Sequence, residues 1–262
     1  MIRAVLFDAF GTLFRPRAPI HVQYAEIASS YGLIVEADDI KAGFKKAFKE
    51  LSTAHPLYGK YSSPPLHYEQ WWSEVIERAL SYAHVADSDL QVALPTLIPE
   101  LIEHFASRKG YTIHDDVLPC LQDLQNSKLK LGIISNSDPR TIMVVESLGI
   151  VPDYVSPDRI TTSWDVGVAK PSRDIFEAAA QKLGVKASET LMVGDDLDED
   201  YHGARAAGLQ SVLLQRTRHD ADYVRRDVGK EELKDVNILT SLTDLPKWIA
   251  SVRENTDAKR TL

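Results

Sequence analysis

The chain has 262 residues, 44% of them apolar, which is enough for one domain with an insertion or for two unequal domains. Its formal net charge is −8 and no long basic stripe offsets it, so nucleic acid is disfavoured as a partner. A single cysteine, Cys120, excludes an intrachain disulfide and is typical of a reducing compartment. The sequence opens directly on an apolar strand, and no apolar run approaches the roughly 18 residues of a membrane helix. We therefore expect a cytoplasmic protein with no membrane partner.

Five short apolar runs predict the strands of a parallel sheet, and the first three end in polar residues. The runs lie at 4–10, 130–138, 189–198, 210–216 and 236–241. Helix-like periodicity fills the segments between them, at 114–126, 139–149, 171–183 and 198–207. Strands that alternate with helices and are apolar almost throughout are typical of a Rossmann-like, doubly wound α/β sheet.

About a hundred residues between the first strand and the helix at 114 contain no convincing strand. Four amphipathic helices are predicted there instead, at 19–32, 36–52, 66–85 and 90–107. We therefore expect an α/β core domain at 1–15 and 111–262, with an α-helical cap domain inserted at 16–110. An insertion directly after the first strand is suited to cover the strand ends.

Polar residues stand at the predicted strand ends, where ligands bind in an open parallel sheet. Each of them also suits a structural role on its own, as a turn residue, a helix cap or a surface charge. Their shared position at strand ends, or at the start of a helix, favours a single cleft instead. These residues are Asp8, Ser135, Asn136, Lys170, Asp195, Asp196, Asp198 and Asp200.

The stretches that carry these residues resemble the four motifs of the haloacid dehalogenase (HAD) superfamily. They are "FDAFGTL", "ISNSD", "VGVAKPSRDIF" and "GDDLDEDYHGARAAG". The last is especially specific, because its two aspartates and three glycines keep the family spacing. The resemblance covers the whole core, and the helical insertion resembles the family's cap. In addition, "PLYG", "QWW" and "SNSDPR" resemble one subgroup, named haloacid dehalogenase-like hydrolase domain-containing protein 3.

The resemblance implies a hydrolase of phosphatase type that acts on a small-molecule substrate. Asp8 would be the nucleophile and would form an aspartyl-phosphate that water later hydrolyses. Ser135 and Asn136, together with nearby backbone N–H groups, would bind the phosphoryl oxygens. Lys170 would neutralise charge on the nucleophile and on the transferring group.

The resemblance also implies Mg²⁺ as a cofactor. Asp8, the backbone carbonyl of Phe10 and Asp195 would bind the ion, and Asp200 would support that site from behind. Several carboxylates in one cleft would repel one another without a hard cation between them. Oxygen ligands of this kind are those that Mg²⁺ prefers.

Phe10 departs from the phosphatase pattern. Family phosphatases usually carry a second aspartate two residues after the nucleophile, which protonates the leaving oxygen and then activates water. A phenylalanine cannot do this, and general acid–base help is typically worth about 10²–10⁴-fold, or roughly 3–5 kcal/mol of barrier. The metal site need not be lost, because the family's ligand at that position is a backbone carbonyl.

Two alternatives stay open. The L-2-haloacid dehalogenases have an aromatic residue at the position of Phe10, in a "DAYGTL" run, and need no metal. The acidic residues at 195–200, and the lack of an arginine in "GFKKAFKELST", favour the phosphatase instead. In the other alternative, the protein binds a phosphometabolite or a protein partner and turns over little. The sequence leaves the oligomeric state open.

Overall fold

The structure is a computed structural model of the chain, and it describes residues 1–216, 229 and 231–260. The chain divides into two compact units. The first, which we call the α/β unit, consists of Met1–Arg15, Ile113–Ser137 and Val145–Leu262. The second, which we call the helical unit, consists of Pro16–Thr112 and Asp138–Val144.

The α/β unit is built on a six-stranded parallel sheet in the order β5-β4-β1-β6-β7-β8. The strands are β1 (Ala4–Phe7), β4 (Lys130–Ser135), β5 (Ile160–Thr162), β6 (Thr190–Gly194), β7 (Gln210–Leu214) and β8 (Ile238–Leu239). β1 and β6 are buried along their whole length, as expected for strands covered on both faces. The structure therefore confirms the predicted Rossmann-like α/β core.

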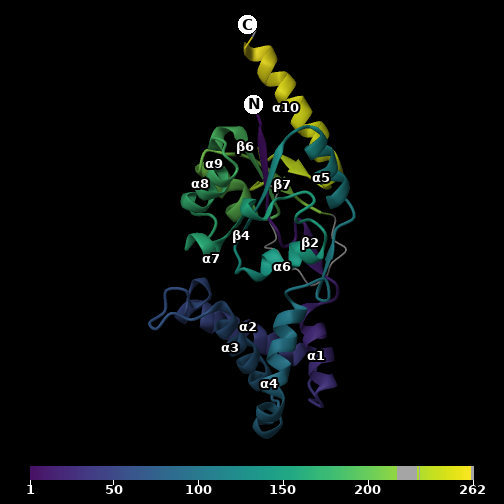
Figure 1. Cartoon of the computed structure of the whole chain (residues 1–262), viewed down its shortest axis with the longest axis vertical. Coiled ribbons are helices and arrows are strands. Elements are labelled where there is room, and N and C mark those ends of the chain that lie inside the picture. Colours follow the sequence, from purple (N-terminus) through teal and green to yellow (C-terminus); the bar gives the residue numbers. More distant parts are fainter. Residues whose placement is uncertain (217–228, 230, 261–262) are drawn as a thin grey trace. The chain divides into compact units, whose positions relative to one another are not determined.

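Helices cover both faces of this sheet (Figure 1). The apolar faces of α8 (Arg173–Lys182) and α9 (Gly203–Ala206) pack with Leu6, Ile134 and Met192 in one buried cluster. α5 (Val117–Asn126) contacts β4 and also α10 (Leu245–Arg260). Their cover excludes water from the sheet, so polar side chains are concentrated where the strands end. The remaining elements that lie wholly in this unit are α7 (Ser163–Val166), η2 (Pro157–Arg159), η3 (Ala187–Glu189), η4 (Leu197–His202) and η5 (Leu242–Asp244).

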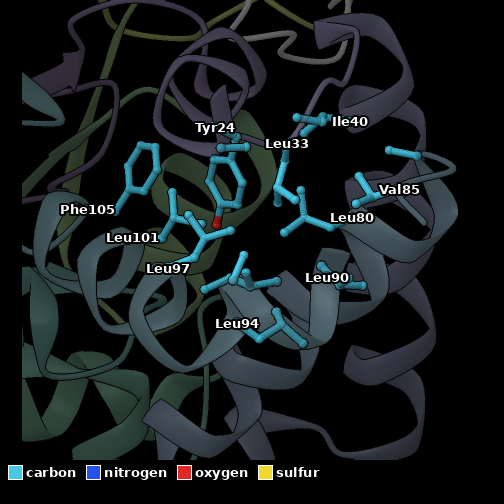
Figure 2. Packing of buried hydrophobic residues seen from close by; sticks show 14 residues of the cluster. Tyr24, Leu33, Ile40, Leu80, Val85, Leu90, Leu94, Leu97, Leu101 and Phe105 are labelled. Atoms are coloured by element: carbon cyan, nitrogen blue, oxygen red, sulfur yellow. The ribbon is translucent and has the colours of Figure 1, made fainter. Parts of the chain in front are cut away.

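The helical unit contains the four helices predicted for the insertion. They are α1 (Ile20–Ser30), α2 (Ala37–Ala54), α3 (Tyr68–Tyr82) and α4 (Asp87–His104), with the short turn η1 (Leu57–Gly59) between α2 and α3. Figure 2 shows their apolar faces meeting in one cluster, in which Tyr24 lies near Leu97 and Leu101. The rings of Tyr24 and Phe105 stack with their centroids 5.1 Å apart. This unit has a hydrophobic core of its own.

Several elements were not predicted from the sequence. β2 (Phe14–Pro16) and β3 (Tyr111–Ile113) form a two-stranded ribbon where the chain passes from one unit to the other. β5 has three residues and α10 is mostly polar, so neither gives a strong periodic signal. By contrast, α6 (Arg140–Ser147) corresponds to the helix predicted at 139–149, and it begins in the segment that groups with the helical unit. Within the described part of the chain, every helix is too short or too polar to span a bilayer.

Candidate active site

Three neighbouring strands of the α/β unit end in polar residues. β1 lies between β4 and β6, with Phe7 in register with Ile133 on one side and Val193 on the other. Asp8 follows β1, Ser135 is the last residue of β4, and Asp195 follows β6; all three are buried. Parallel pairing thus gathers residues from three distant parts of the sequence at one edge of the sheet.

Lys170 joins this edge from the segment that leads into α8. Its Nζ atom lies 2.6 Å from Oδ1 of Asp8 and 2.6 Å from Oδ1 of Asp200. The lysine side chain is only 2% exposed, so water screens neither ion pair appreciably. Lys170 therefore holds the two carboxylates together, 2.6 Å from each.

Asn136 fixes the backbone of Lys170. Its side-chain oxygen accepts a hydrogen bond from the Lys170 N–H at 2.6 Å, and its Nδ2 donates to the Lys170 carbonyl at 3.0 Å. The same Nδ2 donates to Oε2 of Glu199 at 2.8 Å. Asn136 therefore positions the lysine, while its predicted contact with substrate stays a prediction.

The segment after β6 holds its carboxylates through local hydrogen bonds. The Asp196 side chain caps η4 by accepting from the N–H groups of Asp198 and Glu199. The Asp196 N–H donates to Oδ2 of Asp200 at 3.0 Å. A Cβ atom at Gly194 would lie 2.2 Å from Oδ2 of Asp200, so the Asp200 carboxylate occupies space that only glycine leaves open.

Burial and the mutual charges of the cluster act against each other. It raises the pKa of Asp8 to about 6; the charge of Lys170 opposes this rise and that of Asp200 adds to it. Burial by itself lowers the pKa of Lys170, but the charges of Asp200 and Asp8 outweigh it, and the net shift is upward. The lysine is thus held as a cation, whereas burial disfavours the charged form of Asp8.

The donor set fits a hard divalent cation. Asp8, Asp195 and Asp200 each offer a carboxylate oxygen, and these atoms lie within 4.8 Å of one another. Three carboxylates and one ammonium leave an excess of about two negative charges in a buried place. A cation bound by oxygen ligands would balance that excess, and Mg²⁺ prefers such ligands.

Phe10 lies in the turn that follows Asp8. Its ring packs edge-to-face on Phe14, with centroids 5.8 Å apart and planes at 86°. Gly11 has φ of 87°, a conformation that favours glycine, and its N–H donates to the Phe14 carbonyl. An aromatic side chain thus packs within the turn at the place where family phosphatases carry an acid. The predicted use of its carbonyl as a metal ligand stays a prediction.

Two sets of contacts between residues of the quoted stretches were not predicted from the sequence. The Thr12 hydroxyl donates to Oδ1 of Asp195 at 3.0 Å, a contact suggested only by the place of Thr12 in "FDAFGTL". In the helical unit, Nε1 of Trp72 donates to Asp138, which is also paired twice with the Arg140 guanidinium. The guanidinium carbon lies 4.2 Å from the Trp72 ring centre. No sequence spacing links residues 72 and 138.

The parallel sheet, with carboxylates grouped where its strands end, defines a Rossmann-like α/β protein with a candidate active site at that edge. Comparison with protein families identifies the class: the model of the family described as "haloacid dehalogenase-like hydrolase" matches residues 2–208. The chain belongs to this family of hydrolases.

Relatives of similar length carry related descriptions. A Schizosaccharomyces pombe protein described as an uncharacterized hydrolase is 37% identical over 216 residues, which cover 78% of this chain and 86% of that protein. The human haloacid dehalogenase-like hydrolase domain-containing protein 3 is 31% identical over 244 residues, covering 93% of this chain and 92% of its own. The predicted likeness to that subgroup is therefore confirmed.

Solved structures share the fold. A HAD phosphatase from Thermococcus onnurineus matches with a TM-score of 0.59 and 22% identity, covering 95% of this chain and 98% of its own. An L-2-haloacid dehalogenase from Xanthobacter autotrophicus matches with a TM-score of 0.63 and 22% identity. The match covers 95% of this chain and 99% of the dehalogenase chain. At such identities the two similarities bear on the fold alone, so the choice between the two chemistries depends on the residues of the site.

Proposed function

We propose that this hydrolase is a Mg²⁺-dependent phosphatase that acts on a small phosphate ester. The observation that carries the proposal is the buried group of Asp8, Asp195 and Asp200 around the ammonium of Lys170. Phosphoryl transfer needs positioning and positive charge more than it needs elaborate covalent chemistry. The group offers a nucleophile, a fixed cation and oxygen ligands for a second cation in one place.

In the proposed reaction, a carboxylate oxygen of Asp8 attacks phosphorus. The bond from phosphorus to the ester oxygen breaks, and the leaving oxygen keeps the electron pair. Water then attacks the phosphorus of the aspartyl-phosphate, which returns the Asp8 carboxylate and releases phosphate. Lys170 holds Asp8 in place and balances charge, and the Ser135 hydroxyl binds a phosphoryl oxygen. Mg²⁺, when bound by Asp8 and Asp195, supplies further positive charge to the phosphoryl group.

Phe10 shapes the expected substrate range. No carboxylic acid stands two residues after Asp8 to protonate the leaving oxygen. Esters with good leaving groups, such as aryl phosphates, depart without much protonation, whereas alkyl and sugar phosphates need it. We therefore expect the highest turnover on aryl phosphates. We also propose that the helical unit is a cap that selects small substrates and excludes bulk water when it closes.

L-2-haloacid dehalogenase chemistry is the second candidate, and Phe10 is the observation that favours it. Such an enzyme needs a cation for the substrate carboxylate, and the helical unit does contain Arg140. This arginine is paired twice with the buried carboxylate of Asp138, so its charge is already matched. The excess of buried negative charge around Asp8 also opposes attack on an anionic substrate without a metal. Both observations favour the phosphatase.

One assay separates these functions. Phosphate release from 4-nitrophenyl phosphate and from a panel of alkyl phosphates is measured with Mg²⁺ or with EDTA, alongside halide release from L-2-chloropropionate. We expect Mg²⁺-dependent phosphate release that Asp8→Asn abolishes. Asp153→Asn is the control, because Asp153 is an exposed acid of the α/β unit outside the acidic cluster and should retain most activity.

Halide release that resists EDTA and disappears in Asp8→Asn would overturn the phosphatase proposal. A third outcome is the absence of both activities together with a rise in melting temperature on adding Mg²⁺ and beryllofluoride. That result would support a binding protein with little turnover, because beryllofluoride mimics the phosphoryl group on an aspartate.

A further inference from the structure

Arg216 lies two residues beyond the end of β7 and outside the acidic cluster, yet it contacts the turn that follows Asp8. Its Nη2 atom donates to the backbone carbonyl of Thr12 at 2.8 Å. Its Nη1 atom donates to Oδ2 of Asp116 at 2.7 Å. One planar guanidinium therefore ties the Thr12 peptide to a carboxylate at the start of α5.

Asp116 is itself fixed by several donors. Besides Arg216, its Oδ2 atom accepts from the Ser241 hydroxyl at 2.7 Å and from the Leu242 N–H at 2.8 Å. Burial by itself raises the pKa of Asp116, but the hydrogen bonds from Arg216 and Ser241 outweigh it, and the net shift is downward. The carboxylate thus stays charged and provides a rigid anchor for the guanidinium.

Thr12 connects this anchor to the acidic cluster. Its carbonyl oxygen accepts from Arg216, while its hydroxyl donates to Oδ1 of Asp195 at 3.0 Å. Thr12 is fully buried, so no water competes for either bond. Because both bonds start from one residue, the orientation of the Thr12 peptide sets the direction in which its hydroxyl points.

We propose that Arg216 is a positioning residue for the metal site, acting through Thr12 on the Asp195 carboxylate. The inference rests on the proposed Mg²⁺ site and names a residue outside the four motifs. Arg216 keeps the Thr12 hydroxyl aligned, and that hydroxyl holds Asp195 in the orientation that binds the cation. Groups that orient metal ligands in this way typically change metal affinity by about 10–100-fold when removed.

The test measures the apparent Kd for Mg²⁺ from the rise in melting temperature with Mg²⁺ concentration, which requires no substrate. We expect Thr12→Ala to weaken binding about tenfold and Arg216→Met about fivefold. The double variant should bind no more weakly than Thr12→Ala alone, because Arg216 acts through the missing hydroxyl. Thr12→Ser keeps the hydroxyl, so in that background Arg216→Met should again weaken Mg²⁺ binding about fivefold.

Arg3→Met is the matched control. Arg3 is paired with Glu189 in the same unit, but at an exposed position, so Mg²⁺ affinity should stay within twofold. If Arg216→Met does not fold, Arg216→Lys takes its place. Lysine keeps the charge but cannot bond Asp116 and the Thr12 carbonyl with one planar group. Arg216→Lys should therefore also weaken Mg²⁺ binding several-fold.

The outcomes are distinct. If Mg²⁺ stabilises the wild type and both arginine variants bind it equally well, the inference is wrong and the proposed function stands. Losses that simply add in the Thr12→Ala background show a general effect of Arg216 on folding, and also overturn the inference. A wild type that does not respond to Mg²⁺ contradicts the proposed metal site and the inference with it.

Discussion

The ammonium of Lys170 lies 2.6 Å from Oδ1 of Asp8, although 162 positions separate the two residues in the sequence. Lys170 makes a second contact of the same length with Asp200. The lysine is the cation of a buried group that holds three carboxylates. Its single charge leaves the group negative, and this imbalance leads to the first prediction.

We predict that Asp8→Asn stabilises the metal-free protein at pH 8. Burial raises the pKa of Asp8 from near 4 to about 6, so the folded state binds the proton more tightly than the unfolded state does. The free energy of unfolding of the wild type should therefore fall as pH rises from about 4 to about 6, by at most roughly 3 kcal/mol. Urea unfolding in EDTA across this range measures the effect.

In Asp8→Asn that fall should be absent, so the variant becomes more stable than the wild type as pH rises. The difference in free energy of unfolding should nearly vanish at pH 4. The exposed Asp153→Asn serves as the control, and its stability should stay close to that of the wild type at each pH. An Asp8→Asn variant that is less stable than the wild type at pH 8 in EDTA would show that the Lys170 pairing outweighs the burial of Asp8.

We predict that Phe10→Asp raises turnover of alkyl phosphates by about 10²-fold or more, because it supplies the missing acid for the leaving oxygen. Turnover of an aryl phosphate should change far less. The ratio of kcat/KM for the two ester classes is the measurement, and Phe10→Asn controls for loss of the edge-to-face contact with the Phe14 ring. Equal changes in kcat/KM for the alkyl and the aryl phosphate would mean that leaving-group protonation does not limit the reaction.

We predict that Gly194→Ala destabilises the protein by several kcal/mol and weakens Mg²⁺ binding. The added Cβ would lie 2.2 Å from Oδ2 of Asp200, so the carboxylate or the strand end has to move. Gly149→Ala is the control: it has open space around it and φ of 76°, so it should cost about 1 kcal/mol and leave Mg²⁺ affinity unchanged. Melting curves with and without Mg²⁺ measure both effects.

We predict that Asp138→Asn costs roughly 3–5 kcal/mol at pH 7, because it leaves the Arg140 guanidinium buried without its carboxylate. Burial by itself raises the pKa of Asp138, but the hydrogen bond and charge of Arg140 outweigh it and lower the pKa. The stability contributed by this carboxylate is therefore present above pH 4. It is lost as pH falls through the lowered pKa, and the difference between wild type and variant should shrink there.

Trp72 offers a check on the same group. Trp72→Phe keeps an aromatic ring for the Arg140 guanidinium but removes the N–H that donates to Asp138, so it should cost about 1 kcal/mol. In the Asp138→Asn background its cost should be smaller, because the charged acceptor is already gone. Additive costs in a double-mutant cycle of unfolding free energies would show that the two side chains do not interact.

The pattern of apolar and polar residues was enough to predict the fold class and the position of the acidic cluster. Apolar strands that end in polar residues predict a parallel sheet, and in such a sheet the carboxyl ends lie at one edge. Asp8 and Asp195 could therefore be placed together before any coordinates were known. The four helices of the insertion could also be predicted, because each buries one apolar face and its apolar residues recur with the helical period.

The contacts between individual side chains could not be predicted in this way and are known only from the folded structure. The contact of Lys170 with Asp8 and Asp200 depends on side-chain reach across a folded core, and so does the path from Arg216 through Thr12 to Asp195. The same holds for Trp72 and Asp138, which lie in two stretches far apart in the sequence. The periodicity of the sequence predicts which face of a helix or strand is buried, but not which residues of another element that face contacts. Hydrogen bonds and ion pairs between distant residues have no sequence period, and they hold the site together.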